Sequence, residues 1–411
     1  MATAIEAGLC TTRNEDDWTL FNSITVQNLL SFGPDAEPLP LESLNVLIGP
    51  NGSGKSNLLE AIALLRGAPH SDSPFGMRSL IARGGGISEW IWKGNPHGSG
   101  SVEAILDYPS GNQRLRHAIC FKQENQVLHL EDERIENESP SQGEADSYFY
   151  YRYQRGKPVV NVAGADKRGL QSHAVERDLS VLSQLKDPVS YPELTFVSEC
   201  YGSIRLFREW YFGKRDTPLR TPQKPDLPNV QLEENFSNLP LFLNRIAQSH
   251  ATRQELLSAF VNLYEGLTDF GVRIEGGTVQ VYFSEGEFVI PATRLSEGSV
   301  RFLCLLAVLC DPDPPPFIGI EEPEIGLHPD ILPKVAQLLV NTSKRTQVVV
   351  TTHSDVLVDA LTDIPNAVVV CEKHNGRTTM RRLNKEELAP WLETYRLGEL
   401  WSRGDIGGNR W

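Results

Sequence analysis

The sequence predicts an α/β fold, in which a mixed sheet covered by helices is split along the chain by a long α+β insertion. Two stretches predict this fold. A short apolar run at 44–48 leads into a glycine-rich loop and then into helically spaced apolar residues over 56–66, which is the order strand, loop, helix. After residue 289, strand-like apolar runs alternate with helix-like segments, as in a parallel sheet covered by helices. We expect the two stretches to be the two halves of one domain.

The chain divides into six expected segments. These are a loose N-terminal arm at 1–17, the first half of the domain at 18–67, a mostly β portion at 68–174, a mainly helical insertion at 175–288, the second half of the domain at 289–375 and a C-terminal tail at 376–411.

Apolar spacing also predicts individual elements. In the second half of the domain it predicts helices near 297–310, 330–341 and 355–361, and strands at 317–320, 347–352 and 367–371. In the middle of the chain we expect antiparallel strands at 102–106 and 127–130, an exposed acidic loop at 131–146, and mostly helical stretches at 175–211 and 239–267.

The composition is that of an ordinary globular protein, with 40% hydrophobic and 22% charged residues. No apolar run approaches the roughly 18 residues that a membrane-spanning helix needs, and the N-terminus has no charged start followed by an apolar stretch. The six cysteines include no CxxC pair, so reduced thiols are expected and a zinc site is not indicated. We therefore expect a cytoplasmic protein without a membrane partner.

The formal net charge is −14, which repels duplex phosphates unless basic residues gather on one face. Strong sequence-independent DNA binding by the chain alone is therefore disfavoured. One proline-rich stretch collects four basic residues, and it is either a solvated loop or a local basic face: Lys214, Arg215, Arg220 and Lys224.

The segment 49–56 fits the phosphate-loop pattern GxxxxGK(S/T) and lies between the expected strand and helix. Glycines let the backbone N–H groups of such a loop approach phosphate oxygens, and the helix N-terminus adds positive potential. We expect Lys55 to neutralise the β- and γ-phosphates of ATP and the Ser56 hydroxyl to ligate Mg²⁺. The residues of the predicted loop are Gly49, Pro50, Asn51, Gly52, Ser53, Gly54, Lys55 and Ser56.

A second element is the apolar run 317–320, which ends in Glu321 and Glu322 and continues as Pro323 and Glu324. This is the Walker B pattern. We expect Glu321 to belong to the Mg²⁺ shell and Glu322 to polarise the attacking water. An apolar strand that ends in acids is common, so this element gains its weight from following a phosphate loop.

A third element, the sequence LSEGS at 295–299, opens an apolar helix. Ser296 is a good helix N-cap, with Ser299 three residues later. A serine and a glycine at a helix N-terminus also form an anion site, so Ser296 and Gly298 are expected to grip the γ-phosphate of ATP bound to another subunit.

A fourth element is His353, at the end of the apolar run 348–350 and its two threonines. Ligands of open α/β sheets bind at the carboxyl ends of the strands. A lone histidine after a strand is more often a structural residue. After the other three elements in this order, His353 is expected to sense the γ-phosphate.

The phosphate loop, LSEGS, the EEPE segment followed by GLHPD, and TTHS together resemble the ordered motif set of the ABC ATPases. Within that class they are similar to the RecF-like and SMC-like branch. The EEPExGLHP wording and the C-terminal LGELW and GGNRW are similar to small bacterial predicted ATPases, called AAA_21 or OLD-like ATPases without the nuclease domain.

This resemblance implies nucleotide contacts through Asn57, a D-loop at 326–329, and catalytic roles for Lys55, Glu322 and His353. Two departures concern the turnover rate: the signature is LSEGS where transporters have LSGGQ, and Glu321 stands where many relatives have aspartate. The sequence does not place the glutamine of the Q-loop; Gln184 is the candidate, but it is better explained as an ordinary helix glutamine.

The resemblance favours an ATPase that dimerises around ATP, as a homodimer or a higher even-numbered oligomer, and that switches a separately encoded effector in bacterial anti-phage defence. The alternative is a RecF-like DNA repair or recombination ATPase with ATP-dependent DNA binding, so nucleic acid remains a partner class. A transporter ATPase fits poorly, because the long insertion has strand-like stretches.

Overall fold

The computed structural model describes residues 19–408 apart from short gaps at 72, 126, 155–156, 164–168, 173–174, 177, 211–218, 220–222, 226–230 and 262–265. The expected N-terminal arm lies outside the described residues. So do three of the four basic residues of the proline-rich stretch, Lys214, Arg215 and Arg220.

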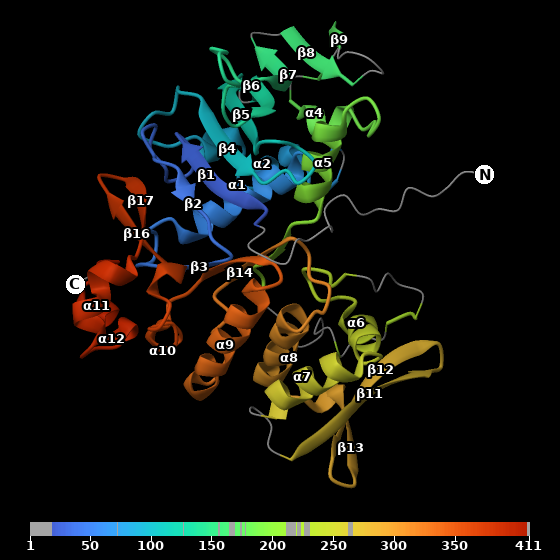
Figure 1. The fold of residues 1–411 in the computed structure, drawn as a ribbon. Helices are drawn as coiled ribbons and strands as arrows, with labels where there is room; N and C mark the ends of the chain where they lie inside the picture. The colour runs from blue at the N-terminus through green and yellow to red at the C-terminus, as the bar shows by residue number, and fades with distance from the viewer. Residues whose placement is uncertain are drawn as a thin grey trace. The chain divides into compact units, whose positions relative to one another are not determined.

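The chain forms two compact units. In the described residues, the first contains 19–204 and 369–382, and the second contains 205–368 and 383–408. Each unit therefore combines segments that are far apart in the sequence (Figure 1).

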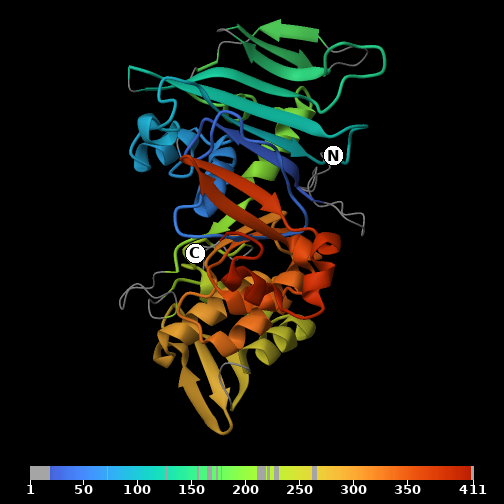
Figure 2. The same ribbon diagram turned by 90° about the vertical axis from the view of Figure 1, so that its left-hand side faces the viewer.

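An eight-stranded antiparallel sheet dominates the first unit (Figures 1 and 2). In spatial order its strands are β2 (Leu39–Pro40), β1 (Phe21–Gln27), β4 (Gly100–Leu106), β5 (Leu115–Glu124), β6 (Val127–Asn137), β7 (Phe149–Gln154), β8 (Lys157–Val162) and β9 (Gly169–Ser172). Buried residues alternate with more exposed ones along β5, as expected for a sheet with one face on a core. The antiparallel strands predicted at 102–106 and 127–130 are confirmed.

Helices and a hairpin complete the first unit. The strand β3 (Leu44–Ile48) is fully buried and precedes α1 (Lys55–Gly67), which confirms the predicted order of strand, loop and helix. The remaining elements are α2 (Met77–Arg83), α3 (Ile87–Trp90), α4 (Val181–Gln184), α5 (Pro192–Gly202) and the antiparallel hairpin of β16 (Val368–His374) and β17 (Arg377–Arg382).

The exposed acidic loop expected at 131–146 is wrong in its first half, because β6 continues to Asn137. Two of its acids, Glu133 and Glu136, are only 1% exposed. Glu133 accepts hydrogen bonds from the Ser180 hydroxyl and from the Val181 N–H at 2.9 Å. It also lies 3.3 Å from His117 Nε2. Buried carboxylates are tolerated when donors surround them, and a pattern of acidic residues alone does not reveal those donors.

The second unit contains a parallel three-strand core. β14 (Phe317–Glu321) pairs in parallel with β10 (Arg205–Phe207) on one side and with β15 (Gln347–Thr351) on the other. The predicted parallel, helix-covered arrangement of the C-terminal half is confirmed for β14 and β15. The helices α8 (Glu297–Leu309), α9 (Leu332–Ser343) and α10 (Asp355–Asp359) also match their predicted positions to within a few residues.

Two further groups of elements belong to this unit. The helices α6 (Leu239–Ile246) and α7 (His250–Val261) contact an antiparallel sheet of β11 (Leu267–Glu275), β12 (Thr278–Glu285) and β13 (Phe288–Pro291), drawn in ochre tones in Figures 1 and 2. After β17 the chain forms α11 (Lys385–Leu392) and α12 (Leu397–Arg403), and α12 packs on α10.

Three strands lie where the sequence predicted helix or tail. β10 falls in the stretch 175–211, β11 begins at the end of 239–267, and β17 falls in the expected tail. β10 has three residues, too few to show a period of two. β17 follows the turn Asn375–Gly376, where both residues have positive φ, and such a pair is a strong hairpin signal.

Two expectations from the composition can be compared with the described residues. The cysteines among them have free thiol groups and form no disulfide with one another: Cys120, Cys200, Cys304, Cys310 and Cys371. No helix in this part of the chain is both long and apolar enough to cross a membrane.

The network around Glu133 gives a test of the first unit. We expect Glu133→Ala to lower the free energy of unfolding by about 3 kcal/mol, because Ser180, Val181 and His117 would lose a buried partner. Urea denaturation followed by circular dichroism measures this change. Glu131→Ala, at an exposed acid on the same strand, is the control; equal effects of the two substitutions would contradict the assigned network.

Candidate nucleotide-binding site

The loop between β3 and α1 has a backbone that only glycine adopts easily. Gly49, Gly52 and Gly54 have φ values of +147°, +79° and +106°. A Cβ at Gly49 would lie 2.2 Å from the carbonyl oxygen of Cys371, and one at Gly54 would lie 2.2 Å from Thr378 Oγ1. Two of the three glycines are thus required both by backbone conformation and by close packing.

Lys55, the first residue of α1, carries its charge in a nearly buried position. The residue is 5% exposed, and its Nζ donates hydrogen bonds to the carbonyl oxygens of Gly49 at 2.7 Å and Pro50 at 3.2 Å. The ammonium is therefore held over the loop, at the positive end of the α1 dipole. A buried cation there favours an anionic ligand.

A buried hydroxyl in the same loop points to the same kind of ligand. Ser53 is 1% exposed, and its Oγ has no hydrogen-bond partner among the residues that the structure describes. Buried polar atoms are normally satisfied by protein, water or ligand. The loop can therefore supply at least this hydroxyl, together with backbone N–H groups, to a phosphate.

The hairpin of β16 and β17 supports the loop from behind. Thr378 Oγ1 donates to the carbonyl oxygen of Ser53 at 2.8 Å and lies 2.6 Å from Ser31 Oγ, and Ser31 Oγ in turn accepts from Asn57 Nδ2 at 2.7 Å. Asn57 was expected to contact nucleotide, but its side-chain amide donates this hydrogen bond to Ser31. Sequence reasoning missed Thr378 and Ser31; the Asn375–Gly376 turn was the available signal for the hairpin.

In the second unit, Glu321 ends β14 and is held by residues that follow β10. Its Oε2 accepts a hydrogen bond from Arg208 Nε at 2.9 Å, and its backbone oxygen accepts from Trp210 Nε1 at 2.6 Å. Its side chain is 17% exposed. The expected metal ligand therefore has a cationic partner that sequence reasoning missed, because the two residues are 113 positions apart.

Glu322 and His353 lie together where β14 and β15 end. Glu322 Oε1 is 3.4 Å from His353 Nε2, and both side chains are about one-third exposed. Glu322 has a φ of +47°, which is uncommon for a residue with a side chain. Its N–H donates to the Thr351 carbonyl oxygen at 2.9 Å. Backbone strain of this kind often occurs at functional sites, where it aims a side chain.

Glu324 links the same two strand ends. Its Oε1 accepts hydrogen bonds from the His353 N–H at 2.6 Å and from Thr352 Oγ1 at 2.8 Å. Burial raises the pKa of this carboxyl, and the donated hydrogen bonds from His353 and Thr352 oppose that rise. Glu324 was noticed only as part of the EEPE pattern, yet it fixes the backbone that carries His353.

The signature segment forms the N-terminus of α8. Ser296 caps the helix as predicted, because its Oγ accepts from the Ser299 N–H at 3.1 Å. The two serine hydroxyls are 2.8 Å apart; if Ser299 donates in that contact, the Ser296 hydroxyl keeps a hydrogen to donate elsewhere. Ser296 is exposed, so a ligand can reach it.

The signature segment also packs on the expected D-loop of the same chain. A Cβ at Gly298 would lie 3.0 Å from the Gly326 carbonyl oxygen, and one at Gly326 would lie 2.3 Å from Arg301 Nη1. Arg301 also forms an ion pair with Glu297 at 2.7 Å. Both glycines therefore have a packing role in addition to any contact with nucleotide.

Gln184 has local hydrogen bonds instead of an evident catalytic position. Its Oε1 accepts from the Glu176 N–H at 2.8 Å, and its Nε2 donates to the Leu179 carbonyl oxygen at 3.0 Å. This geometry favours the ordinary structural explanation of Gln184.

The donor chemistry available for Mg²⁺ is a hydroxyl, Ser56, and a carboxylate, Glu321. Mg²⁺ prefers oxygen ligands and is usually held by one or two protein groups together with phosphate oxygens and water. The described residues contain no group of three His, Cys, Asp or Glu side chains that could hold a metal by themselves. Ser56 and Glu321 thus have the ligand types that a nucleotide-bound Mg²⁺ takes.

The sequence matches a family model, AAA_21, over residues 44–359, which is more than half of the chain. The chain belongs to this family. AAA_21 is described as "AAA domain, putative AbiEii toxin, Type IV TA system". The matched range includes the phosphate loop, LSEGS, the two acids that end β14, and His353. No curated protein matches the chain.

Two solved structures show the fold that this AAA_21 chain shares. One is the Smc head bound to the C-winged helix domain of ScpA, with 15% sequence identity, coverage of 90% of this chain and 99% of that chain, and a TM-score of 0.51. The other is the Smc head domain with an extended coiled coil, bound to the C-terminal domain of ScpA, from Pyrococcus furiosus, with 15% identity, coverage of 91% and 98%, and a TM-score of 0.52.

These comparisons confirm the predicted resemblance to an SMC-like ABC-type ATPase and the predicted fold class. The chain has the fold of an ABC-type phosphate-loop ATPase domain. The predicted lack of a nuclease domain stays a prediction.

The support of the phosphate loop by β17 can be tested with two adjacent threonines. We expect Thr378→Val to weaken ATP binding by about three- to tenfold, because the Ser53 carbonyl oxygen and Ser31 hydroxyl lose a buried partner. Titration of a fluorescent ATP analogue measures the affinity. Thr379→Val, at the exposed neighbouring residue, should leave it unchanged. Equal affinities of wild type and Thr378→Val would remove the assigned support.

Proposed function

We propose that this AAA_21 protein is an ATPase that closes as a pair of chains around ATP and thereby switches a partner effector protein in bacterial anti-phage defence. The observation that carries the enzymatic part is the contact of Glu322 with His353, in a chain whose phosphate loop holds a nearly buried lysine. A carboxylate beside an imidazole is the pair needed to polarise a water and to sense the phosphate that it attacks.

Each expected site residue has a role in this proposal. The phosphate loop binds the triphosphate through its N–H groups, and Lys55 neutralises the β- and γ-phosphates. Ser56 and Glu321 hold Mg²⁺, which when bound neutralises charge on the phosphate oxygens. Glu322 accepts a hydrogen bond from the attacking water and thereby orients and polarises it. His353 donates a hydrogen bond to the γ-phosphate. Catalysis is thus a matter of positioning and charge.

The exposed N-terminus of α8 supports pairing of two chains. Ser296 and Glu297 are exposed, while Ser299 and most of the following helix are buried. We infer that Ser296 and the backbone at Gly298 bind the γ-phosphate of ATP held by a second copy, since a helix N-terminus favours anions. The homodimer is the simplest such assembly, and higher even-numbered oligomers satisfy the same contact.

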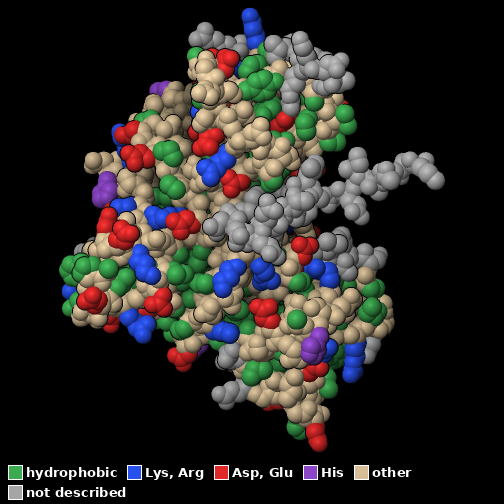
Figure 3. Space-filling view, in the orientation of Figure 1, with side chains coloured by type: hydrophobic (Ala, Val, Ile, Leu, Met, Phe, Trp, Pro, Cys, Tyr) green, Lys and Arg blue, Asp and Glu red, His purple; other side chains and the backbone are tan. Residues whose placement is uncertain are grey.

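The comparison with solved structures supports a separate partner protein. The two Smc heads of similar fold are each bound to a domain of ScpA. The net charge of −14, with acidic and basic side chains interspersed over the face drawn in Figure 3, disfavours sequence-independent DNA binding as the main activity.

Phosphate release from ATP by the purified chain tests the enzymatic part. We expect slow, Mg²⁺-dependent hydrolysis, a loss of ATP binding in Lys55→Ala, and a fall in turnover of about a hundredfold or more in Glu322→Gln with binding retained.

Lys373→Ala and Glu386→Gln, at exposed positions, are the matched controls and should behave as wild type. Unchanged turnover in both Lys55→Ala and Glu322→Gln would refute the site.

A further inference from the structure

Arg208 forms an ion pair with the expected metal ligand, Glu321, within the second unit. Its Nε donates to Glu321 Oε2 at 2.9 Å, with the two side chains 26% and 17% exposed. Two residues later, Trp210 donates to the backbone oxygen of Glu321 at 2.6 Å. The segment that follows β10 therefore holds both the carboxylate and the backbone of Glu321.

The position of Arg208 follows from sheet register. β10 and β14 are parallel, with Phe207 opposite Ile320, so Arg208, the residue after β10, comes next to Glu321, the last residue of β14. Parallel neighbours that leave the sheet at the same edge keep their side chains close. The contact between Arg208 and Glu321 is thus a consequence of the pairing of β10 with β14.

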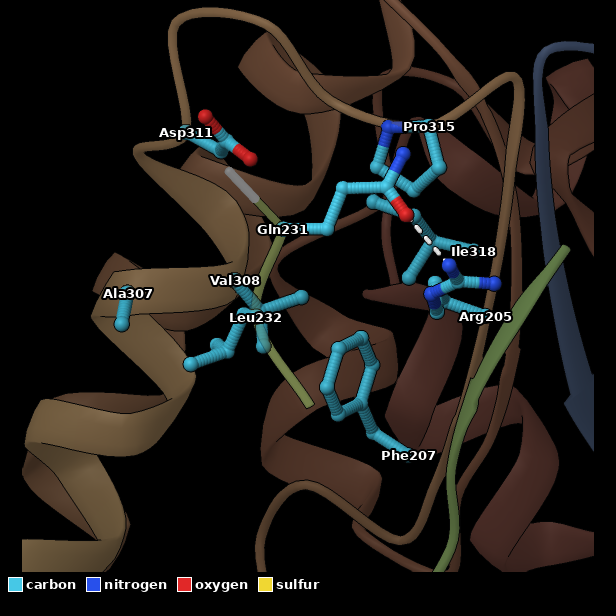
Figure 4. A pocket seen from close by; sticks show the side chains of 9 residues that line it. All are labelled: Arg205, Phe207, Gln231, Leu232, Ala307, Val308, Asp311, Pro315 and Ile318. Carbon is cyan, nitrogen blue, oxygen red and sulfur yellow. Dashed lines mark hydrogen bonds between the residues drawn. The ribbon is translucent and has the colours of Figure 1, made fainter. Parts of the chain in front are cut away.

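The strand β10 is itself anchored along its length. Arg205 donates to Gln231 Oε1, as the dashed line in Figure 4 shows, and the Leu206 N–H donates to Glu234 Oε1 at 2.7 Å. Phe207 stacks on Phe236 with ring centroids 5.3 Å apart. The small cavity beside these residues, about 10 Å³, has room for roughly one water and no ligand. Arg208 therefore follows a strand whose backbone and side chains are held in place by these contacts.

A guanidinium and a divalent cation compete for one carboxylate. An ion pair with Arg208 neutralises Glu321, whereas a metal ligand must offer its negative charge to the metal. A Mg²⁺ on Glu321 would stand a few ångströms from the guanidinium, and this like-charge contact is unfavourable in a partly buried place.

We propose that Arg208 is a positioning residue that occupies Glu321 until Mg²⁺ displaces it, so that metal binding requires the segment after β10 to release this carboxylate. The proposal rests on the proposed function, in which Glu321 is a Mg²⁺ ligand. It adds a metal-dependent step that the family motifs do not contain. A purely structural ion pair between β10 and β14 would affect stability and leave the Mg²⁺ dependence of nucleotide binding unchanged.

The test measures binding of a fluorescent ATP analogue by the full chain at a fixed nucleotide concentration while Mg²⁺ is varied. In Arg208→Gln the Mg²⁺ concentration at half-saturation should fall about fivefold, because the competitor is gone. Binding in EDTA should weaken at the same time, because Glu321 then faces the phosphates without a counter-charge. Arg208→Lys, which keeps the charge, should return the Mg²⁺ midpoint to within about twofold of wild type.

Two comparisons keep the outcome decisive. Arg253→Gln removes an arginine of similar exposure, 31% against 26% for Arg208, that pairs with Asp269 at 2.7 Å in the same unit, and it should not move the Mg²⁺ midpoint. Arg208→Met retains an apolar side chain of similar length and replaces Arg208→Gln in the test if that variant has a lowered melting temperature. An unchanged or raised midpoint in folded Arg208→Gln or Arg208→Met overturns the proposal while leaving the proposed function intact. Absence of any Mg²⁺-dependent nucleotide binding by wild type overturns both.

Discussion

A single carboxylate, Glu324, joins the ends of β14 and β15, and the geometry of the second unit's candidate catalytic groups depends on it. Glu324 accepts hydrogen bonds from the Thr352 hydroxyl and the His353 N–H. These bonds connect the backbone at His353 to the segment that contains Glu322. The Glu322 N–H donates a hydrogen bond to the Thr351 carbonyl oxygen, and Glu322 has a positive φ. The 3.4 Å contact between Glu322 and His353 is therefore fixed by backbone and buried polar groups. A chemical role that needs orientation gains from such a preorganised frame.

The phosphate loop follows the same plan with different groups. Gly49 and Gly54 are required by positive φ and by close contacts with Cys371 and Thr378, and the Thr378 hydroxyl donates a hydrogen bond to the loop backbone. In the phosphate loop and at the ends of β14 and β15, the backbone that carries the functional side chains is held by hydrogen bonds from a neighbouring strand or its end. A residue that never touches substrate can thus determine where the reacting groups lie.

Motifs that are contiguous in the chain could be predicted from the sequence, because strand, loop and cap chemistry is local. This holds for the phosphate loop, the Ser296 cap and the strand that ends in Glu321. Thr378 and Arg208 could not be predicted, because they reach their partners across more than a hundred residues. The burial of Glu133 and Glu136 was also hidden, since it depends on donors from other elements. The pairing of β10 with β14 was missed because three residues show no period.

We propose that the phosphate loop, the two acids after β14 and His353 bind one nucleotide. A structure of the Glu322→Gln chain with Mg²⁺ and ATP tests this proposal, because that substitution should trap the bound triphosphate. We expect the γ-phosphate within about 3 Å of Lys55 and His353, the metal on Ser56 and Glu321, and Ser296 of a second copy on the γ-phosphate. Nucleotide bound away from the 49–56 loop, or a bound metal that does not have Glu321 among its ligands, would overturn the proposed site.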